Sequence, residues 1–242
     1  MKKGLLDTIK SRGYWRINFE PLVDAKKFKR LAECREAVEK ASISFRGWDY
    51  PHIPRRMDDD DNVAAGDNYY EGWTNWWNHI EFWRMYQSGQ FLNYFAVHED
   101  WLELEGWDGL LGRQKQTPAV KPKGVLNIIG GVVYQLTEVF QFLSRLTAAG
   151  VYDEGVRVSI SLHNTEGRKL WTGDFMRHLF QEYKTQLDTI EFSNTFTREE
   201  ILTKPKECAF QAVIYIFERF GWDNPPHGTI NQDQENLINR RF

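Results

Sequence analysis

The chain has few cysteines, little net charge and no long apolar run, and each shortage excludes a class of protein. Its two cysteines, Cys34 and Cys208, have no second Cys or His at metal-ligand spacing, so we expect buried free thiols in a reducing compartment. A net charge of −3 lacks the basic character of a generic nucleic-acid binder. No window approaches the roughly 18 apolar residues that a membrane helix requires, and charges interrupt the N-terminus too early for a signal peptide. We therefore expect a cytoplasmic protein with no membrane partner.

Common catalytic motifs are missing as well. The chain contains no G-x-S-x-G, H-E-x-x-H or paired Cys–His arrangement. Gly130-Gly131 lacks the Lys and the further glycines of a phosphate cradle, and the acidic run 58–61 lacks the Gly and final Glu of a calcium loop. We therefore expect no cofactor and favour a protein that is not an enzyme.

Aromatic residues are abundant, and they are concentrated in one stretch. Thirteen of the 39 residues from Tyr69 to Trp107 are Phe, Trp or Tyr, and seven of the ten tryptophans lie between Trp48 and Trp107. Trp and Tyr combine a large apolar face with a polar tip, so they fill cores, stack on ligands and anchor interfaces. The important surface is therefore expected near this stretch.

The hydrophobic pattern predicts strands and helices that intermingle along the chain. Strands are expected at 14–19, 42–45, 125–136, 156–162 and 189–194, and helices at 25–40, 137–149, 174–186, 206–220 and after a capping box at 197–200. Because the two types do not alternate strictly, we predict a single α+β domain over residues 1–222, with a mixed or mainly antiparallel sheet. Residues 223–242 are predicted to form a polar C-terminal tail or docking segment.

A β-hairpin is predicted around Ser88-Gly89, a dipeptide typical of turns. A two-residue loop would pair Phe82 with Phe95 and His79 with His98. Both faces of this hairpin are mostly apolar, so we expect it to be central in the sheet with helices packed on it.

The sharpest candidate for chemistry lies just before the hairpin. Arg46, Asp49 and His52, followed by Arg55 and Arg56, fall within eleven residues. An acid, an imidazole and guanidinium groups could bind an anion or transfer protons, with Asp49 and His52 as the catalytic pair. The alternative is a polar loop in which Asp49 pairs with Arg46 and His52 caps a turn.

A metal site is a second candidate. The predicted register sets His79 opposite His98, with Glu81 two residues along, and two imidazoles and a carboxylate are plausible metal ligands. A solvated cross-strand pair of histidines is the alternative.

A third candidate is an aromatic binding surface. Five rings precede the hairpin in a polar context, namely Tyr69, Tyr70, Trp73, Trp76 and Trp77. We expect exposed rings among these five, which would act with Trp48 as a stacking platform or an interface anchor. The alternative is that most of these rings belong to the core.

Three segments carry a resemblance to known proteins. They are Gly13-Tyr-Trp-Arg16, Phe45-Arg-Gly-Trp-Asp-Tyr-Pro-His52, and Phe82-Trp-Arg-Met-Tyr-Gln-Ser-Gly-Gln90 followed by Phe95. Together they resemble a group of uncharacterised bacterial proteins that are loosely associated with nucleic-acid-binding domains of the Schlafen AlbA_2 type. The resemblance implies an accessory or sensor role, with bacterial defence as its setting, but it brings no catalytic residues.

These observations lead to one expected function and two alternatives. We expect a non-enzymatic binding module that recognises a protein partner, as one subunit of a complex, or a ligand. The expected binding residues are Arg46, Trp48, Asp49, His52, Arg55, Arg56, Trp73, Trp76 and Trp77. One alternative is a hydrolase or nuclease that uses Asp49 and His52, with or without a metal. The other is single-stranded nucleic-acid binding by aromatic stacking.

Overall fold

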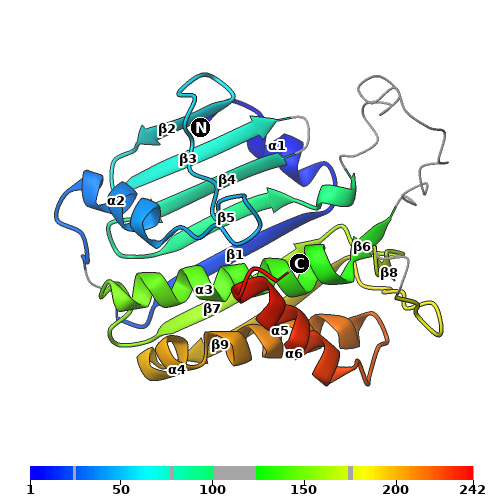
Figure 1. Cartoon of the computed structure of the whole chain (residues 1–242). Coiled ribbons are helices and arrows are strands. Elements are labelled where there is room, and N and C mark those ends of the chain that lie inside the picture. Colours follow the sequence, from blue (N-terminus) through cyan, green and yellow to red (C-terminus); the bar gives the residue numbers. More distant parts are fainter. Residues whose placement is uncertain (24–25, 77–78, 101–123, 174–176, 242) are drawn as a thin grey trace.

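A seven-stranded antiparallel sheet forms the centre of the computed structural model, which describes residues 1–23, 26–76, 79–100, 124–173 and 177–241 (Figure 1). The strands lie in the order β2-β3-β4-β5-β1-β7-β9. Their bounds are Asp61–Ala65 (β2), Tyr69–Trp76 (β3), His79–Tyr86 (β4), Phe91–Ala96 (β5), Tyr14–Pro21 (β1), Val156–His163 (β7) and Thr189–Phe196 (β9). The predicted α+β class is confirmed, and the β4–β5 hairpin lies in the middle of the sheet as expected.

Most of the helices cover one face of this sheet, as Figure 1 shows. They are α2 (Leu31–Ala41), α3 (Tyr134–Ala148), α4 (Arg198–Thr203), α5 (Pro205–Arg219) and α6 (His227–Ile238). Phe142 of α3 packs against Phe19 of β1 and Phe91 of β5. The main core therefore lies between α3 and the central strands.

Strict alternation along the strands decides which residues enter this core. In β7, Val158, Ile160 and Leu162 are buried, and in β1 Trp15, Ile17 and Phe19 face the same side. Because successive strand side chains point to opposite faces, the intervening residues form the other face of the sheet.

The opposite face is covered in part by the short helix α1 (Leu5–Lys10). Leu5 and Ile9 pack there against Trp73, Ile80 and Phe82 in a second, smaller core. Both faces of the β4 segment are therefore buried, which explains why its sequence is apolar without strict alternation.

The predicted hairpin register is wrong by one residue. Glu81 pairs with Phe95 and Phe82 with Tyr94, because the loop contains three residues, 87–89, and not two. Gly89 closes the loop with φ +89°, a left-handed conformation that favours glycine. As a result His79 and His98 are not cross-strand partners, and His98 begins a short 3₁₀ turn (η1, His98–Asp100).

The segment around Gly130-Gly131 also differs from its prediction. The strand expected at 125–136 is only three residues long (β6, Val125–Asn127) and pairs with β8 (Lys169–Trp171). A π-helical turn (η3, Ile128–Val133) follows and continues directly into α3. The side chain of Asn127 accepts hydrogen bonds from the backbone N–H groups of Ile129 and Gly130, so it starts a helix where a strand was expected.

Three further predictions change in detail. The strand expected at 42–45 is reduced to a single bridge between Ile43 and Tyr50. The helix expected at 25–40 begins only at Leu31. No helix forms over 177–186, the described part of the helix expected at 174–186.

The C-terminal segment forms a helix that is packed on the domain. In α6, Ile230 and Leu237 are buried, and Arg177 donates two hydrogen bonds of 2.6 and 2.7 Å to Asp233. In the part of the chain that the structure describes, no helix is both long and apolar enough to cross a membrane.

Candidate functional site

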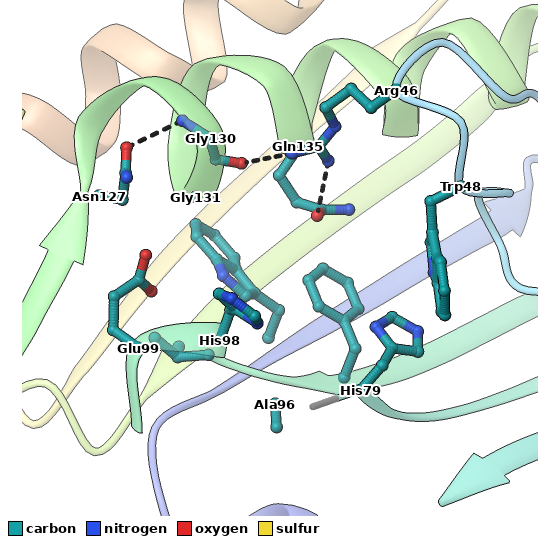
Figure 2. Close-up of a pocket in the computed structure, with 13 residues that line it drawn as sticks. Arg46, Trp48, His79, Ala96, His98, Glu99, Asn127, Gly130, Gly131 and Gln135 are labelled. Carbon is teal, nitrogen blue, oxygen red and sulfur yellow. Dashed lines mark hydrogen bonds between the residues drawn. The ribbon is translucent and has the colours of Figure 1, made fainter. Parts of the chain in front are cut away.

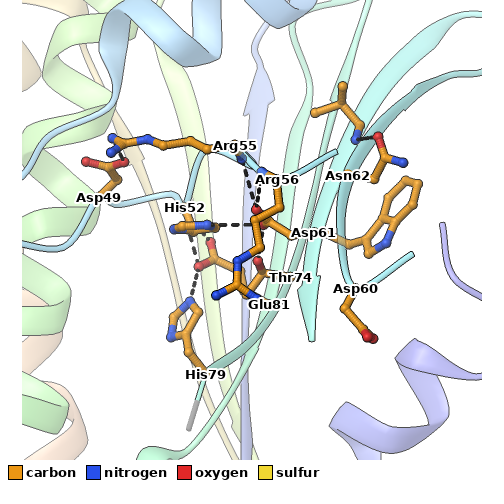
Figure 3. Close-up of polar contacts among 12 residues, drawn as sticks. Asp49, His52, Arg55, Arg56, Asp60, Asp61, Asn62, Thr74, His79 and Glu81 are labelled. Carbon is orange, nitrogen blue, oxygen red and sulfur yellow. Dashed lines mark hydrogen bonds and ion pairs between the residues drawn. The ribbon is translucent and has the colours of Figure 1, made fainter. Parts of the chain in front are cut away.

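The loop of residues 43–56 contacts the end of β3, the start of β4 and the first half of α3 (Figures 2 and 3). Backbone hydrogen bonds between Ile43 and Tyr50 close its first part. Its second part is attached to the sheet, because the indole N–H of Trp83 in β4 donates a hydrogen bond of 2.8 Å to the carbonyl oxygen of His52. The loop is therefore closed on itself in its first part and anchored to the sheet in its second.

Arg46 ties this loop to α3. Its Nε donates to Glu138 Oε1 at 3.1 Å, and its Nη2 donates to Glu138 Oε2. Its Nη1 donates to the carbonyl oxygen of Gly130 at 3.0 Å, and Nη2 also approaches Gln135 Oε1 at 3.4 Å. Because these contacts engage all three guanidinium nitrogens, Arg46 positions the loop and is not a free anion-binding group.

A buried carboxylate lies under the loop. Glu81 of β4 accepts the backbone N–H of His52 at 3.3 Å on each oxygen, and it accepts Asn93 Nδ2 at 2.9 Å. His79 Nε2 lies 2.8 Å from Glu81 Oε2. The correct register brings these groups together, because Glu81 and Asn93 lie on the face of the sheet that faces the loop.

Asp61 organises the other side of the loop (Figure 3). Its Oδ2 accepts the backbone N–H groups of Arg55 and Arg56, each at 2.9 Å, and its Oδ1 accepts the hydroxyl of Thr74. Asp61 Oδ1 also lies 3.3 Å from His52 Nε2, although the pair lacks hydrogen-bond geometry. Hydrogen bonds to the carboxylate lower the pKa of Asp61 against the opposing effect of burial.

Four aromatic rings meet at Trp48. The Trp48 ring stacks on His52 with centroids 5.1 Å apart, and it meets Trp76 and His79 edge-on at 5.2 and 4.9 Å. The guanidinium of Arg56 lies 4.9 Å from the centroid of the Trp76 ring. Trp48 itself is 37% exposed, and no other described tryptophan is so exposed.

Trp48 separates two open cavities. The larger, of about 330 Å³, lies between α3 and β5. Its lining includes Trp15, Arg46, Trp48, His79, Phe95, Ala96, Val97, His98, Glu99, Asn127, Gly130, Gly131 and Gln135, most of them labelled in Figure 2. The smaller, of about 260 Å³, lies beside Arg55, Arg56, Asp61 and Trp76. A gap of about 30 Å³ between Trp48, Glu81 and Glu138 is lined by Trp48 as well.

Burial controls the titration of the groups beneath the loop. It lowers the pKa of His52, and the Glu81 carboxylate opposes this shift. Burial raises the pKa of Glu138, against the effect of Arg46. It also raises the pKa of Tyr50 well above its usual value, with Glu81 and Glu138 adding to the shift.

Several buried polar atoms gather at this site without a hydrogen-bond partner in the described part of the chain. They are Tyr50 Oη, both ring nitrogens of His52, Trp76 Nε1 and Asn93 Oδ1. Because buried polar groups in native proteins are nearly always satisfied, such a gathering is unusual.

The structure brings most of the predicted binding residues together. Arg46, Trp48, Asp49, His52, Arg55, Arg56 and Trp76 all line one or more of the three cavities. Trp73 does not join them, because it is buried on the opposite face of the sheet beneath α1. Its expected exposure is therefore wrong, and Trp77 lies outside the described residues.

The two chemical arrangements expected from the sequence are not formed as predicted. Asp49 pairs with Arg55 at 2.5 Å, and no hydrogen bond joins Asp49 to His52 in the described structure. His79 contacts Glu81 but is not opposite His98, because the register differs. In the described ranges no group of three or more His, Cys, Asp or Glu is arranged to hold a metal ion.

Three contributors to the site were not predicted. Glu138 and Gln135 lie on α3, and Asp61, the last residue of the acidic run 58–61, has no exposed surface. Glu138 stands among apolar positions of an amphipathic helix, and a carboxylate at such a position is the one local signal that could have identified it.

Comparison with protein-family models, curated proteins and solved structures finds no match for this chain.

Proposed function

We propose that this chain is a non-enzymatic binding module, and that it holds a planar group of its ligand or partner against the ring of Trp48. The observation that carries the proposal is the position of Trp48. Its ring is exposed, yet it borders all three cavities of the site and contacts three other rings. A fixed aromatic face beside concave space is typical of stacking sites and of interface anchors.

The surroundings of Trp48 favour recognition over catalysis. All three guanidinium nitrogens of Arg46 donate to Glu138 or Gly130, and Asp49 is paired with Arg55. His52 is 6% exposed and lies beneath the Trp48 ring. A nuclease or hydrolase that relied on Asp49 and His52 would need both groups in reach of its substrate, and this geometry does not favour that.

The size of the larger cavity supports a ligand of modest dimensions. About 330 Å³ lies at the lower end of the range for small-molecule sites, and the buried rings of Trp15 and Phe95 give it an apolar lining. A single ring system or an aromatic side chain of a partner protein would fill it. The resemblance to bacterial proteins associated with AlbA_2 domains supports an accessory role in a cytoplasmic defence system as the setting.

Single-stranded nucleic acid remains the second candidate, and one observation favours it. Arg56 lies over the Trp76 ring, and Arg55, which is paired with Asp49, has a side chain that is 74% exposed. Both cations line the smaller cavity together with Trp48. Base stacking beside backbone-neutralising cations is how single strands are held without sequence readout.

Nuclear magnetic resonance of the tryptophan indole groups tests the proposal. The ¹⁵N-labelled chain is titrated with nucleosides, nucleotides, aromatic amino acids, short aromatic peptides and an oligo-dT strand. We expect one class to shift the Trp48 indole signal, and Trp48→Ala to weaken its binding by about 1–3 kcal/mol, the usual contribution of aromatic stacking.

Phe180→Ala is the matched control, because Phe180 is a fully exposed aromatic residue outside the lining of the three cavities. It should leave the affinity unchanged. Binding that survives Trp48→Ala at full strength would refute the proposed site. If the only bound probe is oligo-dT, with an affinity that falls steeply with salt, the second candidate replaces the first.

A further inference from the structure

The imidazole of a carboxylate–imidazole pair borders the larger cavity. His79, at the first position of β4, lies with its Nε2 2.8 Å from Oε2 of Glu81, two residues along the same strand. The Glu81 side chain is 3% exposed and that of His79 is 26% exposed. The imidazole therefore stands between a buried carboxylate and open space.

The hydrogen bonds around Glu81 determine which nitrogen of His79 carries the proton. The backbone N–H of His52 and the Nδ2 group of Asn93 can only donate, and both point at Glu81. Asn93 Nδ2 also donates to the carbonyl oxygen of Phe82 at 3.1 Å, which fixes the orientation of its amide. Glu81 thus accepts hydrogen bonds from groups that can only donate, and His79 completes the set by donating Nε2–H.

In the neutral form of His79, this arrangement leaves Nδ1 without a proton, and Nδ1 has no protein partner in the described part of the chain. A neutral imidazole with its proton on Nε2 presents Nδ1 as a hydrogen-bond acceptor. His79 lines the larger cavity beside Trp48, as Figure 2 shows. A ligand in that cavity therefore meets an acceptor next to an aromatic face.

A hydrogen-bond donor also borders the same cavity. Gln135 lines it from α3, and its Oε1 lies 3.4 Å from Nη2 of Arg46. Since Arg46 can only donate, Gln135 keeps Oε1 toward it and leaves Nε2 as a donor. The cavity therefore offers an acceptor, a donor and a Trp ring around an apolar lining. A planar ring with an N–H group next to a carbonyl, as in the lactam edge of a nucleobase, matches this set.

We propose that His79, oriented by Glu81, accepts a hydrogen bond from a small lactam-type ligand stacked on Trp48 in the larger cavity. This inference rests on the proposed function, because it assigns a chemical class to the ligand of the same site. Glu81 acts through His79 and is a positioning residue. His98 and Glu99 border the same cavity and contribute to its polarity.

The first test needs no ligand. Long-range ¹H–¹⁵N correlation spectra of the histidine-labelled full chain report which ring nitrogen is protonated. We expect the Nε2–H form at His79, and a shift toward the Nδ1–H form in Glu81→Gln, whose amide can donate to Nε2. An Nδ1–H form of His79 in the wild-type chain would overturn the inference and leave the proposed binding at Trp48 intact.

The second test uses matched probes. Uridine and inosine carry the lactam N–H, and 3-methyluridine and 1-methylinosine carry a methyl group in its place. We expect at least one of the parent nucleosides to bind about tenfold or more tightly than its methylated form, the equivalent of about 1.4 kcal/mol. His79→Phe should abolish this preference, and His163→Phe, outside the cavities, should not.

Three outcomes would count against the lactam assignment, and each has a distinct meaning. Equal binding of parent and methylated nucleosides would overturn the role of His79 but leave stacking on Trp48 standing. Absence of binding by all four, with another ligand class found at Trp48, would overturn the ligand class alone. If His79→Phe still binds the parent nucleoside more tightly than its methylated form, another group is the hydrogen-bond acceptor.

Discussion

Removal of the Arg46 side chain is the most informative perturbation of the loop that carries the site. Arg46→Met keeps the length of the apolar stem but removes every hydrogen bond to Glu138, Gly130 and Gln135. It leaves the Glu138 carboxylate, whose side chain is 3% exposed, without its cation. Loss of one partner of a buried ion pair costs about 3–5 kcal/mol. Because the Arg46 side chain is 31% exposed, we expect the lower end of this range, about 3 kcal/mol.

The stability loss of Arg46→Met should also depend on pH, in a direction that follows from the pKa of Glu138. Burial raises the pKa of Glu138 and Arg46 lowers it, so the variant should raise that pKa further. A carboxyl group whose pKa is higher in the folded than in the unfolded state binds more protons when folded. Its contribution to stability is therefore largest at low pH and is lost as pH rises through the folded pKa. The loss of unfolding free energy in Arg46→Met, relative to the wild type, should thus be smaller near pH 5 than near pH 8.

Urea unfolding followed by circular dichroism measures these free energies. Adding Glu138→Gln to Arg46→Met should recover about 1–2 kcal/mol, because the unpaired charge is then removed. Lys40→Met is the control, since its ion pair with Glu36 is largely solvated and should contribute within about 0.5 kcal/mol. A cost below about 1 kcal/mol for Arg46→Met would refute the reasoning that this network holds the loop.

Three other perturbations test the fold around the site. Gly89→Ala should destabilise the chain by about 1–3 kcal/mol in urea unfolding, because φ is +89° and a Cβ would lie 3.2 Å from Val151. Asp233→Asn should cost about 1–3 kcal/mol and speed proteolysis before α6, because it breaks the bidentate contact with Arg177. Burial lowers the pKa of His52, so the unfolded chain takes up its proton first and wild-type stability should rise with pH up to about 6.5. In His52→Asn, the urea midpoint should not show this rise with pH.

Local patterns were sufficient to predict much of the fold. The alternation of Val158, Ile160 and Leu162 predicts β7, and Thr197 with Glu200 forms the predicted capping box at the start of α4. Such signals depend on neighbours in the sequence, so they can be read without tertiary contacts. The register of the hairpin could not be predicted from local patterns. It depends on a single extra loop residue, and the left-handed Gly89 fits loops of either length.

Only part of the candidate site, likewise, could be predicted from the sequence. The loop from Arg46 to Arg56 could be identified, because unlike charges, an imidazole and a tryptophan occur close together in the sequence. Its partners could not, because Glu81 and Glu138 lie on separate elements and reach the loop only through the tertiary fold. Trp73 and Trp76 looked equivalent in the sequence, yet three residues along one strand place them on opposite faces of the sheet.

The Trp48 indole signal provides the most direct measurement of the central claim. The full chain is titrated with a ligand that binds, and the indole N–H signals of its tryptophans are followed by nuclear magnetic resonance. We expect the Trp48 signal to shift first and furthest, with Trp76 next because the two rings are in contact. A ligand that shifts Trp171 or Trp222 and leaves Trp48 unchanged would contradict the claim that this loop is the binding site.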